Sequence, residues 1–561
     1  MHAKKTLPKL KIMQIKNFRF LPVLSTLSSY GKESFTSDLK ASVNVALLAL
    51  PQSMAYALVA GLPIKYGLLG SAVASLTSGI LGRTHCITLG PTNATSVLLF
   101  GTFASSGLVL KSGMAGSEAL LMLPWIVFLS SLFLLLASIL RISYMIQFIS
   151  RTVITAYITA AAFLIIANQS KHVLGLESSG EFIPSTFLEI FSVTITSLGN
   201  TSLPALSLSL ITAFVFLLLQ RRIRTFPNVA ISLLIASLFG FLFQSKGWTL
   251  SYLSSFESNL SLFSLPNLLS LENHFESILW SSFAIALLCL LEGLSIGKSL
   301  SARTGDRIDA DRETFSIGFA NLGCSFMSGM PASGSLTRSS LNVNSGAKTS
   351  LSNFYTGILI LAGYLMVGDL VSLIPLPALA TLVIFIGASL IKGRQITTVS
   401  KATRADAITF SITLLVGLLI SLQVAIFIGV ATSLLLLLKK VAEPELVEQG
   451  YNQAGELAEI SKDAKRPVPE VSIVHVEGVL FFAAADLFYE QIRRVGDDEN
   501  LRVLVLKLLH AHHLDATSVL ALEELLDYLK EKNCHVLLCE VRKDVLRILK
   551  DSGVLTRMNR K

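Results

Sequence analysis

Long apolar runs alternate with short polar segments over most of this chain, from about residue 38 to residue 440. Many of the runs approach the ~20 residues that a helix needs to cross the hydrocarbon core of a bilayer. The pattern predicts a polytopic α-helical membrane domain with about fourteen spans, several of them shorter than a full crossing. The predicted spans are residues 39–62, 66–81, 92–106, 119–140, 145–167, 203–219, 228–243, 277–300, 314–328, 335–344, 351–367, 376–391, 406–420 and 422–438.

The last part of the chain, residues 441–561, has a different pattern, in which short apolar stretches alternate with Glu, Lys, Arg and Asp. A strand followed by a helix is expected from residue 471 and again from residue 501, and a further strand from residue 535. This alternation predicts a soluble α/β domain. The predicted organisation is an N-terminal tail (1–37), a transmembrane domain (38–440), a linker (441–469) and a C-terminal domain (470–561).

Composition and charge support this division. Charged residues make up 15% of the chain, whereas soluble domains average about 25%. Basic residues are concentrated in every second predicted loop, for example at Arg221, Arg303 and Arg394, and the other loops carry few, such as Lys65 and Lys246. By the positive-inside rule, both termini are then cytoplasmic in a cell (inner or plasma) membrane. The net charge of +9 is thus explained by topology, and no nucleic-acid partner is expected.

The two halves of the membrane domain, about residues 38–244 and 275–440, share one irregularity. In each half the third span is short and follows a Gly- and Pro-containing break, LGPTNATS at 89–96 and GMPASGSLTR at 329–338. Halves of about seven spans each have opposite orientations in the membrane, so the pattern predicts an inverted repeat. Short, interrupted spans at corresponding positions are a good indicator of a transporter's binding site.

A helix that begins near the bilayer midplane leaves amide N–H groups unpaired and carries partial positive charge at that end. Two such ends form a site for an anion, to which an arginine adds a charge and paired donors. The alternatives are that Arg338 reaches an interface or pairs with an acid, and that the hydroxyl residues only pack helices. The candidate residues at the breaks are Thr92, Asn93, Ser333, Ser335, Thr337 and Arg338.

Two further spans carry polar residues at helical spacing. Glu292 shares a helix face with Ser295, and a carboxyl group at that depth is a candidate to take a proton or hold sodium. The alternative is that Glu292 is a fixed partner of Arg338 or of a backbone donor. In the first span, Gln52 and Tyr56 follow a proline that should bend the helix, so they are candidate site residues, with helix packing as the alternative.

The sequence gives no indication of a metal site, a disulfide framework or an enzyme active site. The cysteines Cys86, Cys289, Cys324, Cys534 and Cys539 have neither zinc-site nor disulfide spacing. The cluster of His510, His512 and His513 has no further ligand at metal-site spacing. No nucleotide-binding loop or nucleophile motif is present, so we expect no enzyme activity, cofactor, metal or ATP-driven pumping.

Four stretches, taken together, resemble the SulP/SLC26 anion transporters along nearly the whole chain. They are LALPQSMAYALVAGLPIKYGL, LGPTNATS, LLEGLSIGKSLSARTG and GSLTRSSLNVNSGAKT, the last being especially similar to sulfate transporters of the family. The resemblance implies core and gate domains, an anion site between the third and tenth spans, an elevator-like movement of the core and a homodimer. It implies that Glu292 matches the glutamate implicated in proton coupling, and that Arg338 favours an inorganic oxyanion.

The C-terminal domain resembles a STAS domain. The stretch LDATSVLALEEL is similar to the STAS loop in which an aspartate precedes a phosphorylatable hydroxyl, which makes Asp515 and Thr517 candidate regulatory residues. The usual next glycine is replaced by Ser518, and the alternative role of Asp515 and Thr517 is to cap the following helix. An unidentified cytoplasmic partner of this domain is expected.

These observations favour a secondary active transporter that takes up sulfate with protons by an elevator-type mechanism. The alternatives are transport of bicarbonate or a C4-dicarboxylate, coupled to protons or sodium, and an anion exchanger or channel of the same family. A passive channel would not need Glu292 to titrate. A membrane scaffold or sensor, whose output comes from the STAS domain, is the alternative from another functional class.

Overall fold

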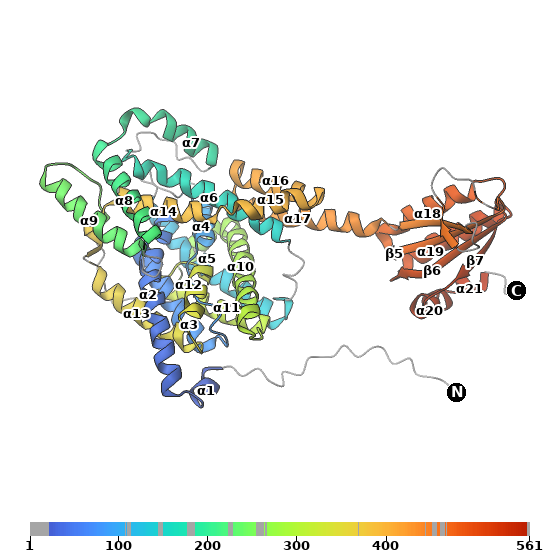
Figure 1. The fold of residues 1–561 in the computed structure, drawn as a ribbon, viewed down its shortest axis with the longest axis horizontal. Helices are drawn as coiled ribbons and strands as arrows, with labels where there is room; N and C mark the ends of the chain where they lie inside the picture. Colours follow the sequence, from blue (N-terminus) through green and yellow to red (C-terminus); the bar gives the residue numbers. More distant parts are fainter. Residues whose placement is uncertain are drawn as a thin grey trace. The chain divides into compact units, whose positions relative to one another are not determined.

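The computed structural model describes residues 22–106, 108, 114–143, 150–176, 186–222, 228–253, 263, 266, 268–368, 370–443, 445–451, 457–460, 466 and 468–557. Most of the predicted N-terminal tail and the start of the predicted span 145–167 lie outside these residues. The chain divides into two compact units, Met1–Val430 and Ala431–Lys561 (Figure 1). Each unit is described separately below.

Helices build the first unit, apart from two very short strands, β1 (Leu89–Gly90) and β2 (Ser333–Gly334). Within the described residues, a helix covers each predicted span. These helices are α2 (Lys32–Val59), α3 (Ile64–Leu81), α4 (Asn93–Ser105), α5 (Ser117–Ile139), α6 (Arg151–Val173), α8 (Leu203–Arg222), α9 (Asn228–Ser245), α10 (Leu268–Thr304), α11 (Ala310–Phe326), α12 (Leu336–Asn344), α13 (Leu351–Val367), α14 (Leu376–Leu390), α16 (Arg404–Leu419) and α17 (Leu422–Ala442).

In the part of this unit that the structure describes, three helices fall outside the predicted spans: α1 (Pro22–Leu27), α7 (Phe187–Thr196) and α15 (Gly393–Ala402). All are too short to cross a bilayer, so apolar length, the signal that predicts a span, does not reveal them. The start of α7 has a local cause, because Thr186 and Glu189 form a reciprocal capping box. None of the residues of α15 is buried, which is typical of a helix that lies on a surface.

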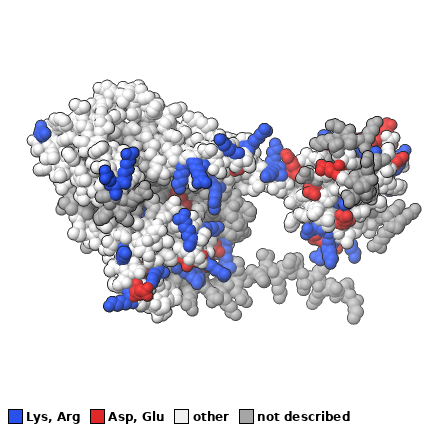
Figure 2. Space-filling model, in the orientation of Figure 1, with Lys and Arg blue, Asp and Glu red and all other residues white. Residues whose placement is uncertain are grey.

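Apolar surface covers much of the first unit. Among the described residues, eight helices are long and apolar enough to cross a membrane, and shorter apolar helices accompany them. Large apolar side chains point outward, such as Phe214 at 67%, Leu234 at 73% and Met366 at 77% exposure. Figure 2 shows that the visible face of this unit is largely uncharged. In water such a surface would be unfavourable, so lipid is its natural environment.

The helices of the first unit pack as two groups. In one group, α5 packs against α10 and α11, and α3 and α2 pack against α13. In the other, α6 packs against α14 and α16, and α8 against α9 and α14. Small residues allow the closest approaches: a side chain at Gly79 of α3 would come within 2.4 Å of the backbone nitrogen of Phe354 in α13. The sequence halves are therefore interleaved, since each group contains helices from both.

The second unit contains a five-stranded sheet with strand order β4-β3-β5-β6-β7. The strands β5 (Val471–Val479), β6 (Val503–His512) and β7 (His535–Cys539) are parallel, and β3 (Glu445–Tyr451) pairs antiparallel with β5 and with β4 (Leu457–Glu459). Strands β3 and β4 lie within the residues predicted as the linker. The helices of this unit are α18 (Phe482–Gly496), α19 (Ala516–Glu531), α20 (Lys543–Asp551) and α21 (Val554–Arg557).

Candidate functional site

Two helix N-termini meet inside the first group of helices. Strand β1 pairs antiparallel with β2, with Gly90 opposite Ser333, and each strand is followed at once by a short helix, α4 or α12. Because the strands run in opposite directions, the two helices leave this point in opposite directions. Their unpaired amide groups and the positive ends of their dipoles are therefore brought together at one place.

Side chains from neighbouring helices hold the two breaks in position. The amide of Asn321 in α11 donates to the carbonyl oxygen of Ala332 and accepts from its N–H, each at 2.9 Å. The hydroxyl of Ser75 donates to the carbonyl of Leu89 at 3.1 Å. Backbone groups that the broken helices leave without internal partners are thus satisfied, which makes the breaks stable parts of the fold.

Arg338, in the first turn of α12, is 0% exposed. Its guanidinium donates to the hydroxyl of Ser71 at 3.1 Å and to the carbonyl oxygen of Pro91, and its Nε has no hydrogen-bond partner. Among the described residues, no carboxylate lies within ion-pair distance of it. Arg338 therefore neither extends to an interface nor forms an ion pair with an acid, and Glu292 acts on its buried positive charge only from beyond ion-pair distance. Such a charge is unfavourable without an anion.

Glu292 of α10 lies at the first break. Its Oε2 accepts a hydrogen bond from the hydroxyl of Thr92 at 3.0 Å, and Thr92 caps the start of α4 together with Thr95. One turn earlier on α10, the carbonyl of Cys289 accepts from the hydroxyl of Ser333 at 3.3 Å. Helix α10 therefore contacts both breaks, and the half-buried carboxyl group of Glu292 is connected to the N-terminus of α4.

The candidate residues of the first and third spans are also buried. Gln52 and Tyr56 follow Pro51 inside α2, and both are 5% exposed. The Tyr56 hydroxyl is near enough to Arg338 and Glu292 to interact with both charges. Asn93 is 6% exposed, and its side-chain oxygen, like that of Gln52, has no hydrogen-bond partner. Buried polar atoms without partners are unusual in proteins, so they are available to a ligand or to water.

The remaining candidates lie at the margin of the site. Ser335 is the N-cap residue of α12, and its hydroxyl is 3.2 Å from that of Thr337, which is exposed. Ser295 is also exposed, and within the described part of the chain its hydroxyl has no hydrogen-bond partner. The structure thus places Ser335 at the N-terminus of α12, where the two helix starts meet, and leaves Thr337 exposed. It gives Ser295 no direct contact with the partners of Glu292.

Besides Ser75 and Asn321, three residues at this site are not singled out by the sequence. Ser71 holds Arg338, Gly90 lies against the guanidinium, and the hydroxyl of Tyr157 in α6 donates to the carbonyl of Ala94 at 3.0 Å. Tyr157 belongs to the second group of helices and contacts the start of α4 in the first. Only Gly90, which lies in the predicted break, had a signal in the sequence. Ser71 and Tyr157 occur in ordinary apolar runs.

Gly90 provides a direct test of the position of Arg338. A Cβ atom at residue 90 would clash with a terminal nitrogen of the guanidinium, and the φ of +156° at Gly90 is one that alanine rarely adopts, so the Gly90→Ala variant has to displace Arg338 or shift the backbone of the break. We expect its anion affinity to fall by at least about tenfold, equivalent to ~1.4 kcal/mol. Gly101→Ala is the matched control, since a Cβ in α4 at that position meets nothing within 4 Å. Equal affinity of the two variants would contradict the assigned position.

In the second unit, Asp515 joins two helix starts. Its carboxylate accepts from the N–H of Ser518 at 2.9 Å, as the N-cap of α19, and from the N–H of Phe482 at the start of α18 at 2.7 Å. Partial burial raises the pKa of Asp515, but these amide groups outweigh that effect and hold it below its usual range. Asp515 is therefore a capping residue, and Thr517 beside it is exposed.

The chain is similar to known proteins along most of its length. A family model described as the sulfate permease family matches residues 35–413, and a STAS domain model matches residues 464–560. A probable sulfate transporter 4.2 of Arabidopsis thaliana is 26% identical over 550 residues, covering 93% of this chain and 78% of that protein. A sodium-independent sulfate anion transporter of Bos taurus is 26% identical over 565 residues, covering 95% and 88%.

The fold is also similar to a solved structure, that of the murine Solute Carrier 26 family member A9 (Slc26a9) anion transporter in the inward-facing state. The TM-score is 0.86 at 19% sequence identity, and the match covers 99% of this chain and 93% of that one. At this level of identity the likeness concerns the fold, and it extends over both the helical part and the C-terminal α/β domain.

Proposed function

We propose that this chain, which belongs to the sulfate permease family, takes up sulfate together with protons as a secondary active transporter. Its family consists of membrane anion transporters rather than enzymes. The observation that carries the proposal is Arg338, a fully buried cation with no carboxylate partner among the described residues, beside two helix N-termini. The sulfate transporters among its relatives support this choice of substrate.

The charge of the site suits a dianion. Each helix N-terminus is equivalent to roughly +0.5 elementary charge, so two of them and the guanidinium of Arg338 together offer about +2. A divalent oxyanion balances this charge, and its oxygens can accept from several donors at once. Hydroxyl and amide groups for this purpose are present at Thr92, Asn93, Ser335 and Thr337.

Proton coupling follows from the position of Glu292. When its carboxyl group is ionised, the local charge falls to about +1, and the carboxylate repels an arriving anion. Protonation removes that repulsion, so proton and sulfate favour each other's binding, and by linkage this effect is reciprocal. The hydrogen bond from Thr92 places Glu292 at the start of α4, where the proposed anion would be held.

The two groups of helices suggest how the site changes sides. Both breaks, Arg338 and Glu292 belong to the group that contains α3, α10 and α12. We infer that this group moves as a body against the group that contains α6 and α14, as in an elevator mechanism. The hydrogen bond between Tyr157 and Ala94 is a contact that such a movement would break. A homodimer and a cytoplasmic partner of the STAS domain belong to the same proposal.

Uptake of labelled sulfate into proteoliposomes tests this function. An inward proton gradient, an inward sodium gradient and no gradient are compared, with bicarbonate, fumarate and chloride as competitors. We expect the proton gradient to drive accumulation that only sulfate-like anions suppress. Absence of sulfate uptake, with flux of bicarbonate or fumarate, would reject sulfate as the substrate. Flux that never exceeds the anion's own gradient would reject symport and indicate an exchanger or channel.

A further inference from the structure

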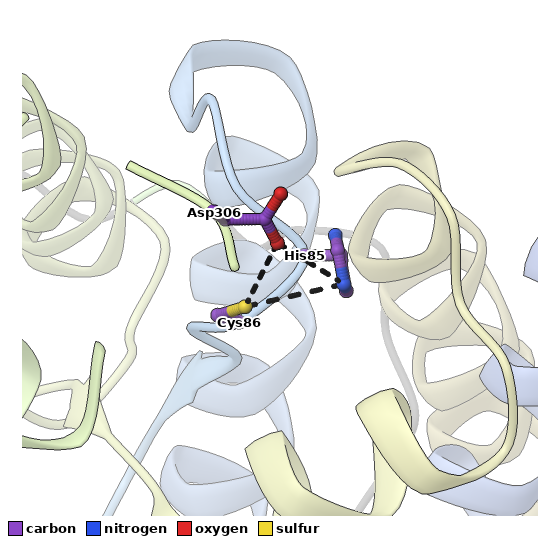
Figure 3. A group of neighbouring side chains, drawn as sticks. All are labelled: His85, Cys86 and Asp306. Atoms are coloured by element: carbon purple, nitrogen blue, oxygen red, sulfur yellow. Dashed lines mark hydrogen bonds and ion pairs between the residues drawn. The ribbon is translucent and has the colours of Figure 1, made fainter. Parts of the chain in front are cut away.

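A second cluster of chemically active side chains lies away from the anion site. His85 and Cys86 belong to the segment between α3 and β1, and Asp306 follows the end of α10. Their ligand atoms all lie within 4.8 Å of one another, although Cys86 and Asp306 are separated by 220 positions in the sequence. Figure 3 shows the three side chains converging from two separate segments. Both segments are on the predicted cytoplasmic side.

The separations between the ligand atoms are close to those of a tetrahedral metal centre. Cys86 Sγ is 3.9 Å from His85 Nε2 and 3.7 Å from Asp306 Oδ2, and Nε2 and Oδ2 are 3.8 Å apart. Typical zinc–ligand bonds and tetrahedral angles give ligand–ligand separations of about 3.4–3.6 Å. A contraction of a few tenths of an ångström would therefore bring all three atoms to bonding distance from one ion.

The surroundings hold the three ligands in place and leave one side open. The hydroxyl of Thr304 donates to Asp306 Oδ2 at 2.7 Å, and the amide of Asn342 donates to the carbonyl of His85 at 3.0 Å. Cys86 is completely buried, whereas the side chain of Asp306 is 44% exposed. An ion can thus reach the site from water, and a water molecule can supply a fourth ligand.

We propose that His85, Cys86 and Asp306 bind a divalent transition metal ion of the zinc type. A thiolate, an imidazole and a carboxylate form the mixed set that zinc accepts, whereas calcium and magnesium prefer oxygen ligands alone. The bound ion fastens the end of α10, the helix of Glu292, to the segment that leads into β1 and Gly90. It thereby joins the two sequence halves within the helix group that holds the anion site. The metal site does not depend on the identity of the transported anion.

Another group with metal-binding residue types, His475, Glu477 and His510, lies on β5 and β6 of the second unit. His475 and Glu477 already contact each other at 2.9 Å, and this group has no cysteine. Of the three clustered histidines singled out in the sequence, only His510 belongs to it. A probe that reports thiolate coordination therefore distinguishes the proposed site from this second group.

The test is a titration of the purified full-length protein with Co²⁺, followed by displacement with Zn²⁺. We expect thiolate-to-cobalt charge-transfer absorption in the near ultraviolet, saturating at one ion per chain and removed by excess Zn²⁺. The Cys86→Ser variant should lack this absorption. Asp306→Asn, which changes a partly exposed side chain, should bind Co²⁺ at least about tenfold more weakly. Cys539→Ser, which changes a partly exposed cysteine outside the cluster, should behave as wild type.

Two outcomes would overturn the proposal. One is a wild-type protein without the thiolate absorption at saturating Co²⁺. The other is absorption that persists unchanged in both Cys86→Ser and Asp306→Asn, because the thiolate would then come from another cysteine. Size-exclusion profiles of each variant show whether it is folded, and Asp306→Asn keeps the test decisive if Cys86→Ser does not assemble.

Discussion

Replacing Arg338 with alanine is expected to abolish measurable sulfate binding. The guanidinium is fully buried and has no carboxylate partner among the described residues, so in the proposed complex the anion is its counter-charge. Removing one member of a buried ion pair costs about 3–5 kcal/mol, which corresponds to a loss of affinity of hundreds-fold or more. Equilibrium binding of labelled sulfate to the purified protein, at constant pH and salt concentration, measures this loss.

The Arg338→Lys variant separates charge from geometry. Lysine keeps the positive charge but lacks the planar set of donors that reaches Ser71 and Pro91 together. We expect its affinity to lie between those of the wild type and Arg338→Ala. Arg404→Ala, which removes an exposed arginine from the first turn of α16, is the control and should bind normally. Near-normal affinity in a folded Arg338→Ala protein would remove Arg338 from the site.

The spanning helices could be predicted because the bilayer imposes a simple requirement. A chain that crosses hydrocarbon must pair its backbone groups internally and present apolar side chains over a defined length. Both properties are visible in the sequence, and so are the Gly- and Pro-containing breaks before α4 and α12. Helices α7 and α15 and strands β3 and β4 are short and depend on local capping or on sheet pairing, so no comparable length signal marks them.

At the proposed anion site, the sequence indicates the kinds of residue but not their partners. The position of Arg338 next to a break predicts an anion-binding residue, with an interfacial or acid-paired arginine as the alternatives, and only the three-dimensional packing distinguishes the alternatives from a buried, unpaired charge. Its hydrogen bonds reach Ser71 on α3 and Pro91 at the other break, which are distant in the sequence. Likewise, Glu292 was a candidate partner of Arg338, whereas the structure pairs it with Thr92.

The same limitation explains why the cluster around Cys86 was not predicted. Metal sites are recognised in a sequence by ligands at short, regular spacing, and Asp306 lies 220 positions from Cys86. The interleaving of the two sequence halves brings the segment after α3 close to the end of α10. Sites assembled across the halves of an inverted repeat therefore become visible only when the packing of the repeats is known.

The Glu292→Gln variant is expected to lose proton-driven sulfate uptake while retaining sulfate exchange. Glutamine keeps an oxygen that can accept from Thr92, as Glu292 does at 3.0 Å, but it carries no charge and does not titrate. It therefore resembles the protonated carboxyl group at every pH. In the wild type, sulfate affinity should rise as pH falls, because protonation removes the repulsion between carboxylate and anion. In the variant, affinity should stay at its low-pH level throughout.

Glu313→Gln provides the matched control for this prediction. Glu313 is a buried carboxyl group of the membrane unit, 4% exposed, and it accepts from the backbone N–H of Arg83 at 3.1 Å, in the segment that precedes β1. If burial of any carboxyl group were enough for coupling, both variants would lose pH-driven uptake. We expect loss only in Glu292→Gln, because only that carboxyl group is hydrogen-bonded to the cap of a helix at the anion site. If proton-driven accumulation survives in Glu292→Gln, the coupling proton belongs to another group. If the variant loses sodium-driven uptake rather than proton-driven uptake, Glu292 is a sodium ligand.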